Sequence, residues 1–78
     1  MTELPDDALT RDEMVAYAEA QGWKAWGRLR KYPQGSSYQA FRRKNEYVWI
    51  GFAFVERTGR GIAQDFRYAA KEAKELVA

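Results

Sequence analysis

Arginine and aromatic side chains crowd the middle of the chain, and they offer the clearest chemistry. Residues 20–45 hold seven Lys or Arg and no acid, whereas residues 1–19 hold six Asp or Glu against one Arg. Guanidinium groups bind phosphates, and aromatic rings stack on unpaired bases. If these side chains share one face of a sheet, the pattern predicts a nucleic-acid-binding surface.

The predicted binding site takes its members from this block and from the apolar run that follows it. They are Trp26, Arg28, Arg30, Tyr38, Arg42, Arg43, Lys44, Tyr47 and Trp49. Aromatic residues and arginine are also enriched in protein–protein interfaces. The sequence therefore leaves three alternatives open: a nucleic-acid platform, a surface for a protein partner or a second copy of the chain, and a covered structural face.

The residues most often used in catalysis are missing. The chain has no Cys and no His, which removes the usual general base and the usual zinc ligands. Asp6, Asp7, Asp12 and Glu13 crowd a predicted helix start, where the helix dipole favours negative charge. The pair Gly59-x-Gly61 lacks the third glycine of a dinucleotide-binding fingerprint. We therefore expect a binding protein without cofactor or metal, and not an enzyme.

Length and hydropathy set further bounds. The 78 residues are enough for one domain, predicted over residues 9–78 behind a polar tail at 1–8. The tail has no apolar stretch typical of a secretory signal, and no run approaches the ~20 apolar residues that span a bilayer. A cytoplasmic protein that does not contact membranes is the expectation.

The longest apolar run, Glu46–Glu56, predicts the central strand of the domain. Alternate residues of a strand point to opposite faces. One predicted face carries Tyr47 and Trp49. The other, predicted to be the core face, carries Val48, Ile50, Phe52 and Phe54.

The segments before this run predict one helix and two strands. A capping box, Thr10-x-x-Glu13, predicts a helix from Arg11 to about Gln21, and Gly22 is suited to end it. Trp23–Tyr32 is predicted as a strand with Ala25, Gly27 and Leu29 inward, followed by a turn at 33–36. Ser37–Arg43 is the next strand. A hairpin at Lys44-Asn45 would place Arg42 opposite Tyr47 and Phe41 opposite Val48.

The C-terminal third predicts a second helix. Apolar residues recur at spacings of three and four, at Ile62, Phe66, Ala69, Ala70, Ala73, Leu76 and Val77. The helix could start near Gly61 or Asp65, or Gly61–Asp65 could form a short fourth strand across Arg57–Arg60. The predicted fold is α+β in the order α-β-β-β-α, with an antiparallel three-stranded sheet and both helices on one face.

This order, with Gly59-Arg60-Gly61 leading into an alanine-rich helix, resembles the topology of a double-stranded-RNA-binding domain. In that family, paired lysines at the start of the last helix and a histidine-bearing loop grip the duplex. Phe66 and Arg67 stand where the lysines would fall, and the histidine loop is missing. The resemblance therefore implies an order of elements and carries no function over.

Two functions follow as expectations. The first is a small module that docks on nucleic acid, or on a nucleic-acid-handling complex, through the basic aromatic face. The second is a protein-interaction or inhibitor domain, such as a protein encoded by a virus or mobile element that blocks a host enzyme or defence complex. A homodimer through the same face is a further expectation.

Overall fold

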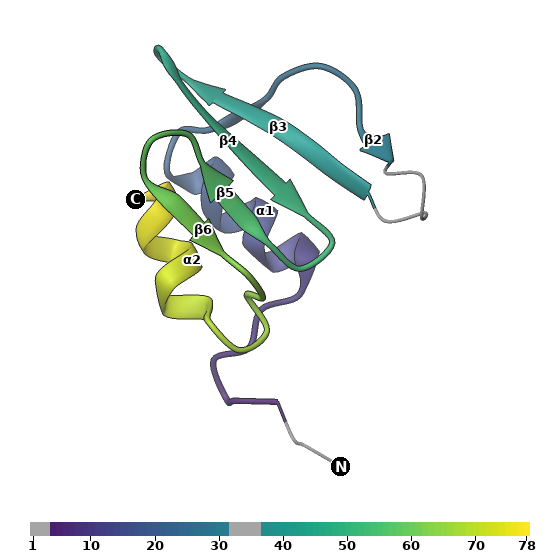
Figure 1. The fold of residues 1–78 in the computed structure, drawn as a ribbon, viewed down its shortest axis with the longest axis vertical. Helices are drawn as coiled ribbons and strands as arrows, with labels where there is room; N and C mark the ends of the chain where they lie inside the picture. Colours follow the sequence, from purple (N-terminus) through teal and green to yellow (C-terminus); the bar gives the residue numbers. More distant parts are fainter. Residues whose placement is uncertain (1–3, 32–36) are drawn as a thin grey trace.

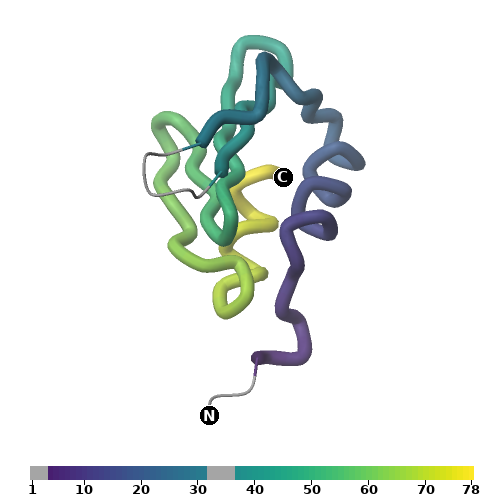
Figure 2. The backbone as a smooth tube through the Cα atoms, turned by 90° about the vertical axis from the view of Figure 1, so that its right-hand side faces the viewer, coloured from purple at the N-terminus to yellow at the C-terminus, as the bar shows by residue number. Residues whose placement is uncertain are grey.

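The computed structural model describes residues 4–31 and 37–78. Its elements follow the chain in the order α1 (Arg11–Ala20), β1 (Lys24–Ala25), β2 (Arg30–Lys31), β3 (Ser37–Arg43), β4 (Glu46–Gly51), β5 (Val55–Arg57), β6 (Gly61–Ala63) and α2 (Ala70–Val77) (Figure 1). Both helices lie on one side of an antiparallel sheet (Figure 2). The predicted α+β class is therefore confirmed. The predicted turn at 33–36 and Tyr32 fall outside the described residues.

Among the described residues the sheet has six strands, where the sequence predicts three and a possible short fourth. Its order is β1-β3-β4-β5-β6, and β2 also pairs with β3. The β3–β4 hairpin has the predicted register, with Arg42 opposite Tyr47 and Phe41 opposite Val48. Lys44 takes the left-handed conformation at the hairpin tip, with φ of 56°. Two of the extra strands arise because two segments predicted as single strands are each broken, and the third is β6, which follows the alternative of a short strand after Arg60.

The first break divides the central apolar run. Strand β4 ends at Gly51, the chain reverses across Phe52 and Ala53, and the Gly51 N–H donates to the Phe54 carbonyl at 2.8 Å. A methyl group at Gly51 would overlap the ring of Phe54, so glycine lets this hairpin close. Phe52 is consequently 62% exposed, and its predicted place in the core is wrong. Phe54 is partly buried and covers Gly51 instead of joining the core.

Truncating Phe52 should therefore have little effect on stability. We expect Phe52→Ala to change the free energy of unfolding by no more than about 0.5 kcal/mol, as for other surface substitutions. A buried phenylalanine would cost about 3–5 kcal/mol. Urea denaturation followed by circular dichroism distinguishes the two values, and a loss in the upper range would restore Phe52 to the core.

The second break lies in the predicted strand Trp23–Tyr32. Within the described residues 23–31 of this segment, the strands that pair with β3 are β1 and β2, and the chain between them leaves the sheet at Gly27, which has φ of 82°. Ala25 and Leu29, predicted to face inward, are exposed. We call the chain between β1 and β2 the excursion. Gly27 permits the left-handed backbone conformation at which the excursion leaves the sheet, and a regular strand has no such conformation.

The core lies between the sheet and the two helices. Its large, fully buried side chains come from every layer and are Trp23, Phe41, Phe66, Met14, Ile50, Val48, Val55 and Val77. Trp23 also donates its indole N–H to the carbonyl of Val77 at 2.7 Å. One tryptophan thus ties the segment after α1 to the end of α2.

Helix α1 begins with the predicted capping box. The Glu13 N–H donates to the Thr10 hydroxyl at 3.1 Å, and the Thr10 N–H donates to the Glu13 carboxylate at 2.9 Å. The hydrogen bond from the Thr10 N–H is the largest cause that lowers the pKa of Glu13, and the Thr10 side chain lowers it further. This contribution to stability is present above the ordinary carboxyl pKa and is lost as the pH falls through the lowered one. Gly22 follows the helix with φ of 95°, as predicted.

Removing the Thr10 cap should destabilise the domain moderately. We expect Thr10→Ala to lower the free energy of unfolding by about 1 kcal/mol through loss of the hydroxyl acceptor. Thr10→Ser keeps that acceptor and should retain most of the stability in the same thermal or chemical unfolding experiment. Equal losses in both variants would assign the effect to the missing methyl group.

The region before α2 follows the alternative of a short fourth strand. Gly61–Ala63 forms β6, paired with β5, and the helix begins only at Ala70. The intervening turn is held by Asp65, whose carboxylate accepts bonds from the main chain and side chain of Arg67 at 2.8–2.9 Å. Such side-chain bonds compete with helix formation. The prediction that the helix starts near Gly61 or Asp65 is therefore wrong. Ile62, predicted to lie on the apolar side of that helix, is in β6 and is 47% exposed.

Candidate nucleic-acid interface

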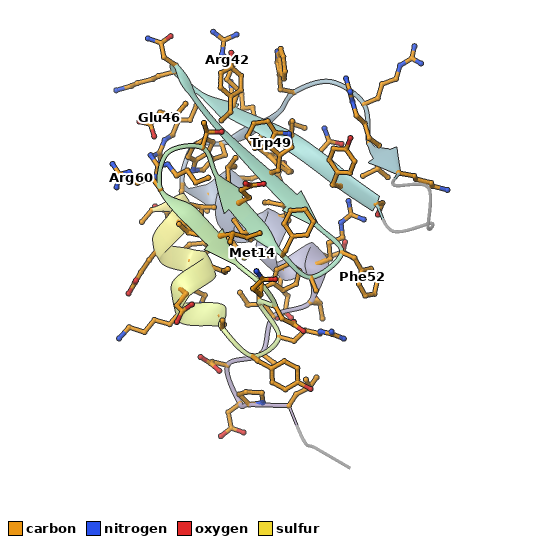
Figure 3. The ribbon with its side chains drawn as sticks, in the orientation of Figure 1. Met14, Arg42, Glu46, Trp49, Phe52 and Arg60 are labelled. Carbon is orange, nitrogen blue, oxygen red and sulfur yellow. The ribbon has the colours of Figure 1, made fainter. Side chains whose placement is uncertain are left out.

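The sheet face opposite the helices carries most of the predicted site. Directly paired residues in an antiparallel sheet point to the same side. The pairs place Ala40 and Glu56 on either side of Trp49, and Ile62 beyond Glu56. We call this surface the outer face; it consists of Lys24, Trp26, Arg30, Tyr38, Ala40, Arg42, Tyr47, Trp49, Glu56 and Ile62. Arg42 and Trp49 mark it in Figure 3.

The excursion between β1 and β2 positions Trp26 on this face. The Trp26 N–H donates to the Ala40 carbonyl at 2.8 Å, and the side-chain amide of Gln39 donates to the Gly27 carbonyl at 3.1 Å. These bonds hold the loop against β3 without a continuous strand. The indole remains 52% exposed, so it is available for stacking.

Aromatic rings and a guanidinium gather beside this loop. The rings of Trp26 and Tyr47 are tilted by 60° with centroids 5.3 Å apart, and the Arg42 guanidinium lies 5.8 Å from the Tyr47 centroid. Arg42 also donates from Nε to the Lys44 carbonyl at 2.9 Å. The guanidinium is therefore held in place while Arg42 remains exposed.

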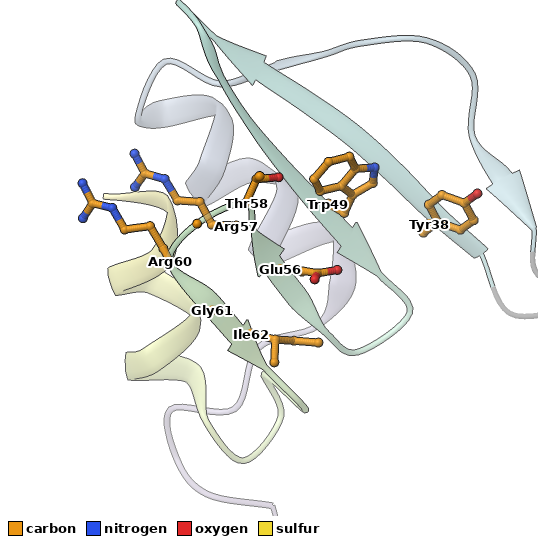
Figure 4. Close-up of a pocket in the computed structure, with 9 residues that line it drawn as sticks. Tyr38, Trp49, Glu56, Arg57, Thr58, Arg60, Gly61 and Ile62 are labelled. Atoms are coloured by element: carbon orange, nitrogen blue, oxygen red, sulfur yellow. The ribbon is translucent and has the colours of Figure 1, made fainter.

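Two hollows indent the outer face, and Tyr38 and Trp49 line both of them. The first, of about 440 Å³, is completed by Trp26, Gly27, Arg30 and Ala40. The second, of about 610 Å³, is completed by the β5–β6 hairpin and lined by Glu56, Arg57, Thr58, Gly59, Arg60, Gly61 and Ile62 (Figure 4). Both volumes fall in the range of ordinary small-ligand sites.

The structure brings together six of the nine predicted site residues: Trp26, Arg30, Tyr38, Arg42, Tyr47 and Trp49. Lys44 is exposed at the tip of the β3–β4 hairpin, and Arg28 is exposed between β1 and β2. Arg43 has the strand parity of Phe41 and lies on the helix side, where it donates to the Gln21 carbonyl at 2.9 Å. Arg43 is therefore separate from the outer face.

The site predicted from the sequence omitted four residues. Lys24, Glu56 and Ile62 belong to the outer face, and Thr58 lines its second hollow. Lys24 pairs with Arg42, and its alternation with Trp26 was a signal in the sequence. Glu56 comes to lie beside Trp49 only because the chain reverses after Gly51. No signal short of that turn would have identified Glu56 or Ile62.

A second cationic cluster, on the helix side, has a structural role. Arg57 is 5% exposed, forms an ion pair with Glu46 and donates to the Leu76 carbonyl at 2.9 Å. Burial lowers the pKa of Arg57, and the nearby guanidinium groups lower it further. The guanidiniums of Arg43 and Arg57 lie 4.4 Å and 5.2 Å from the Trp23 ring. Because its donors are occupied inside the fold, Arg57 lines the second hollow without offering it a free cation.

The part of the chain that the structure describes contains neither a cluster of metal-ligating residues nor a membrane-spanning helix. No group of three or more His, Cys, Asp or Glu there could hold a metal ion. No helix there has the length and apolar character needed to cross a membrane.

Comparison of the chain with family models, with curated proteins and with solved structures gives no match. The outer face and its hollows are therefore the observations from which a function can be inferred.

Proposed function

We propose that this protein is a non-enzymatic cytoplasmic module that binds single-stranded nucleic acid, alone or within a nucleic-acid-handling complex, through its outer face. The observation that carries the proposal is the placement of Trp26, Tyr47 and Trp49 on one face together with Arg30 and Arg42. A basic surface with aromatic rings is the common design of proteins that bind single strands without strong sequence preference.

The rings favour a single strand over a duplex. Bases in a duplex are already stacked on one another, whereas bases of a single strand are free to stack on protein rings. Such stacking contributes about 1–3 kcal/mol per base. Trp26 and Trp49 both line the first hollow, so a base that enters it meets two indole rings.

The cations are suited to the sugar–phosphate backbone. Lys24, Arg30 and Arg42 belong to β1, β2 and β3, which lie on one side of the aromatic residues of β4. A strand lying along β3 would bring its phosphates to these groups while its bases turn toward β4. Exposed Lys44, at the tip of the β3–β4 hairpin, and exposed Arg28, between β1 and β2, add further positive charge.

A protein partner is the second candidate, and Ile62 is the observation that favours it. This side chain is 47% exposed on the same face and lies next to Glu56, which repels phosphate. An interaction or inhibitor domain, for example one encoded by a virus or mobile element, would use such an apolar residue as an anchor. Pairing of two copies through the same face belongs to this alternative.

Titration of labelled single and duplex strands at two salt concentrations tests the proposal. Arg42→Gln should weaken binding and reduce the dependence of log K on log salt by about 1, because one phosphate contact is lost. Trp49→Ala should weaken binding with little change in that slope, because stacking releases no counterions.

Lys71→Gln is the matched control for charge, since Lys71 is exposed on α2, on the other side of the sheet. It should leave the affinity and the salt slope close to those of the unmodified protein. The absence of any salt-sensitive binding tighter than ~10⁻⁴ M would rule out nucleic acid as the ligand. A solution mass measurement on the same sample then tests self-association.

A further inference from the structure

An acidic side chain lies on the outer face beside its aromatic residues. Glu56 pairs with Trp49 on one side and with Ile62 on the other, and it is the one carboxylate in the set that forms this face. Opposite residues of neighbouring strands have Cβ atoms about 4.5–5.5 Å apart. A planar ligand stacked on the Trp49 indole therefore presents its edge to the carboxylate.

The side chain of Glu56 has no hydrogen-bond or ion-pair partner among residues 4–31 and 37–78. Arg57 is bound to Glu46 and to the end of α2, and the Arg60 side chain is directed away from Trp49 (Figure 4). Both carboxylate oxygens are thus open to the second hollow, which Glu56 lines. A carboxylate accepts hydrogen bonds and donates none.

This geometry selects among the nucleic-acid bases. Guanine carries two adjacent donors on its Watson–Crick edge, N1–H and the 2-amino group, which match the two oxygens of a carboxylate. Adenine and cytosine carry one amino group beside a ring nitrogen that is an acceptor. Thymine and uracil carry one N–H between two carbonyls. Only guanine offers two adjacent N–H donors, one for each oxygen of the carboxylate.

We propose that the second hollow is a guanine subsite, in which the base stacks on Trp49 and donates from N1–H and the 2-amino group to Glu56. The inference rests on the proposed binding of single strands and adds base selectivity to it. Ile62 supplies an apolar wall, and the Thr58 hydroxyl, which points toward the Trp49 side of the hollow, is a partner for the sugar. The first hollow, with Trp26 and Arg30, has no such carboxylate and takes any base.

The test compares three labelled DNA nonamers by fluorescence anisotropy: nine thymines, and the same strand with either guanine or hypoxanthine at the centre. A good bidentate pair discriminates by about 1–3 kcal/mol, which corresponds to about fivefold to 150-fold in affinity. The guanine strand should therefore bind at least about fivefold more tightly than the thymine strand. Hypoxanthine keeps N1–H and lacks the 2-amino group, so its strand should be intermediate.

Two variants assign the selectivity to the carboxylate. Glu56→Gln should remove the preference for the guanine strand, because the amide presents a donor where the base also has one. Glu72→Gln, an exposed carboxylate on α2, should keep the preference. A preference that survives in Glu56→Gln overturns the inference.

The outcomes for the unmodified protein separate the two proposals. Equal affinity for the guanine and thymine strands overturns the guanine subsite and leaves binding of single strands intact. Failure to bind any of the three strands overturns the proposed function and the subsite together.

Discussion

Replacing Trp23 with alanine should lower the free energy of unfolding by about 3–5 kcal/mol, the range for truncation of a large buried aromatic side chain. Trp23 is 1% exposed and is the largest of the fully buried side chains. Its indole N–H bond to Val77 and its contacts with the guanidiniums of Arg43 and Arg57 are lost in the same step. Small domains have only about 5–15 kcal/mol of stability, so most of the margin would disappear.

Two further variants separate the causes of this loss. Trp23→Phe keeps a ring but removes the donor to Val77, so its cost should be smaller than that of alanine. Trp26→Ala removes an exposed indole and should cost no more than about 1 kcal/mol while weakening strand binding. Unfolding should be followed by circular dichroism, because each variant alters the tryptophan fluorescence. A loss below about 1 kcal/mol for Trp23→Ala would contradict its place in the core.

The parts of the fold that follow from neighbouring residues could be predicted. The Thr10–Glu13 box and Gly22 bound α1 by local hydrogen bonds and backbone conformation, and both ends agree with the structure. The register of β3 and β4 could be predicted because a shift of one residue would move Phe41 out of the core. The same register placed Arg42, Tyr47 and Trp49 on one face.

The reversal after Gly51 could not be predicted, because its cause is a contact that forms only in the folded chain. The run from Glu46 to Glu56 has the β-branched and aromatic composition of one strand. In the folded chain the Phe54 ring packs over Gly51, where a Cβ atom would otherwise lie, and the run forms a hairpin instead of one strand. Phe52 is exposed as a result, and Glu56 comes to lie beside Trp49, where the candidate site gains its carboxylate.

The burial of Arg57 could not be predicted either, because it also depends on a contact between distant parts of the chain. Its surroundings, Arg57-Thr58-Gly59-Arg60-Gly61, are typical of an exposed turn. The side chain is buried because the last carbonyls of α2, far along the chain, come to lie beside β5 and accept its hydrogen bonds. Cations are favoured at a helix C-terminus. Only the packing of α2 on the sheet reveals this role.

Replacing Arg57 with methionine should cost about 1.5–3 kcal/mol, the range for hydrogen bonds that involve a charged group. The change removes the donors to Leu76 and Ala78 while retaining an apolar stem against Trp23. Arg57→Ala also loses that stem and should cost more. Glu46→Gln breaks only the ion pair, whose acidic partner is half exposed, and should cost no more than about 1 kcal/mol. Equal losses for Glu46→Gln and Arg57→Met in chemical unfolding would instead assign the stabilisation to the ion pair.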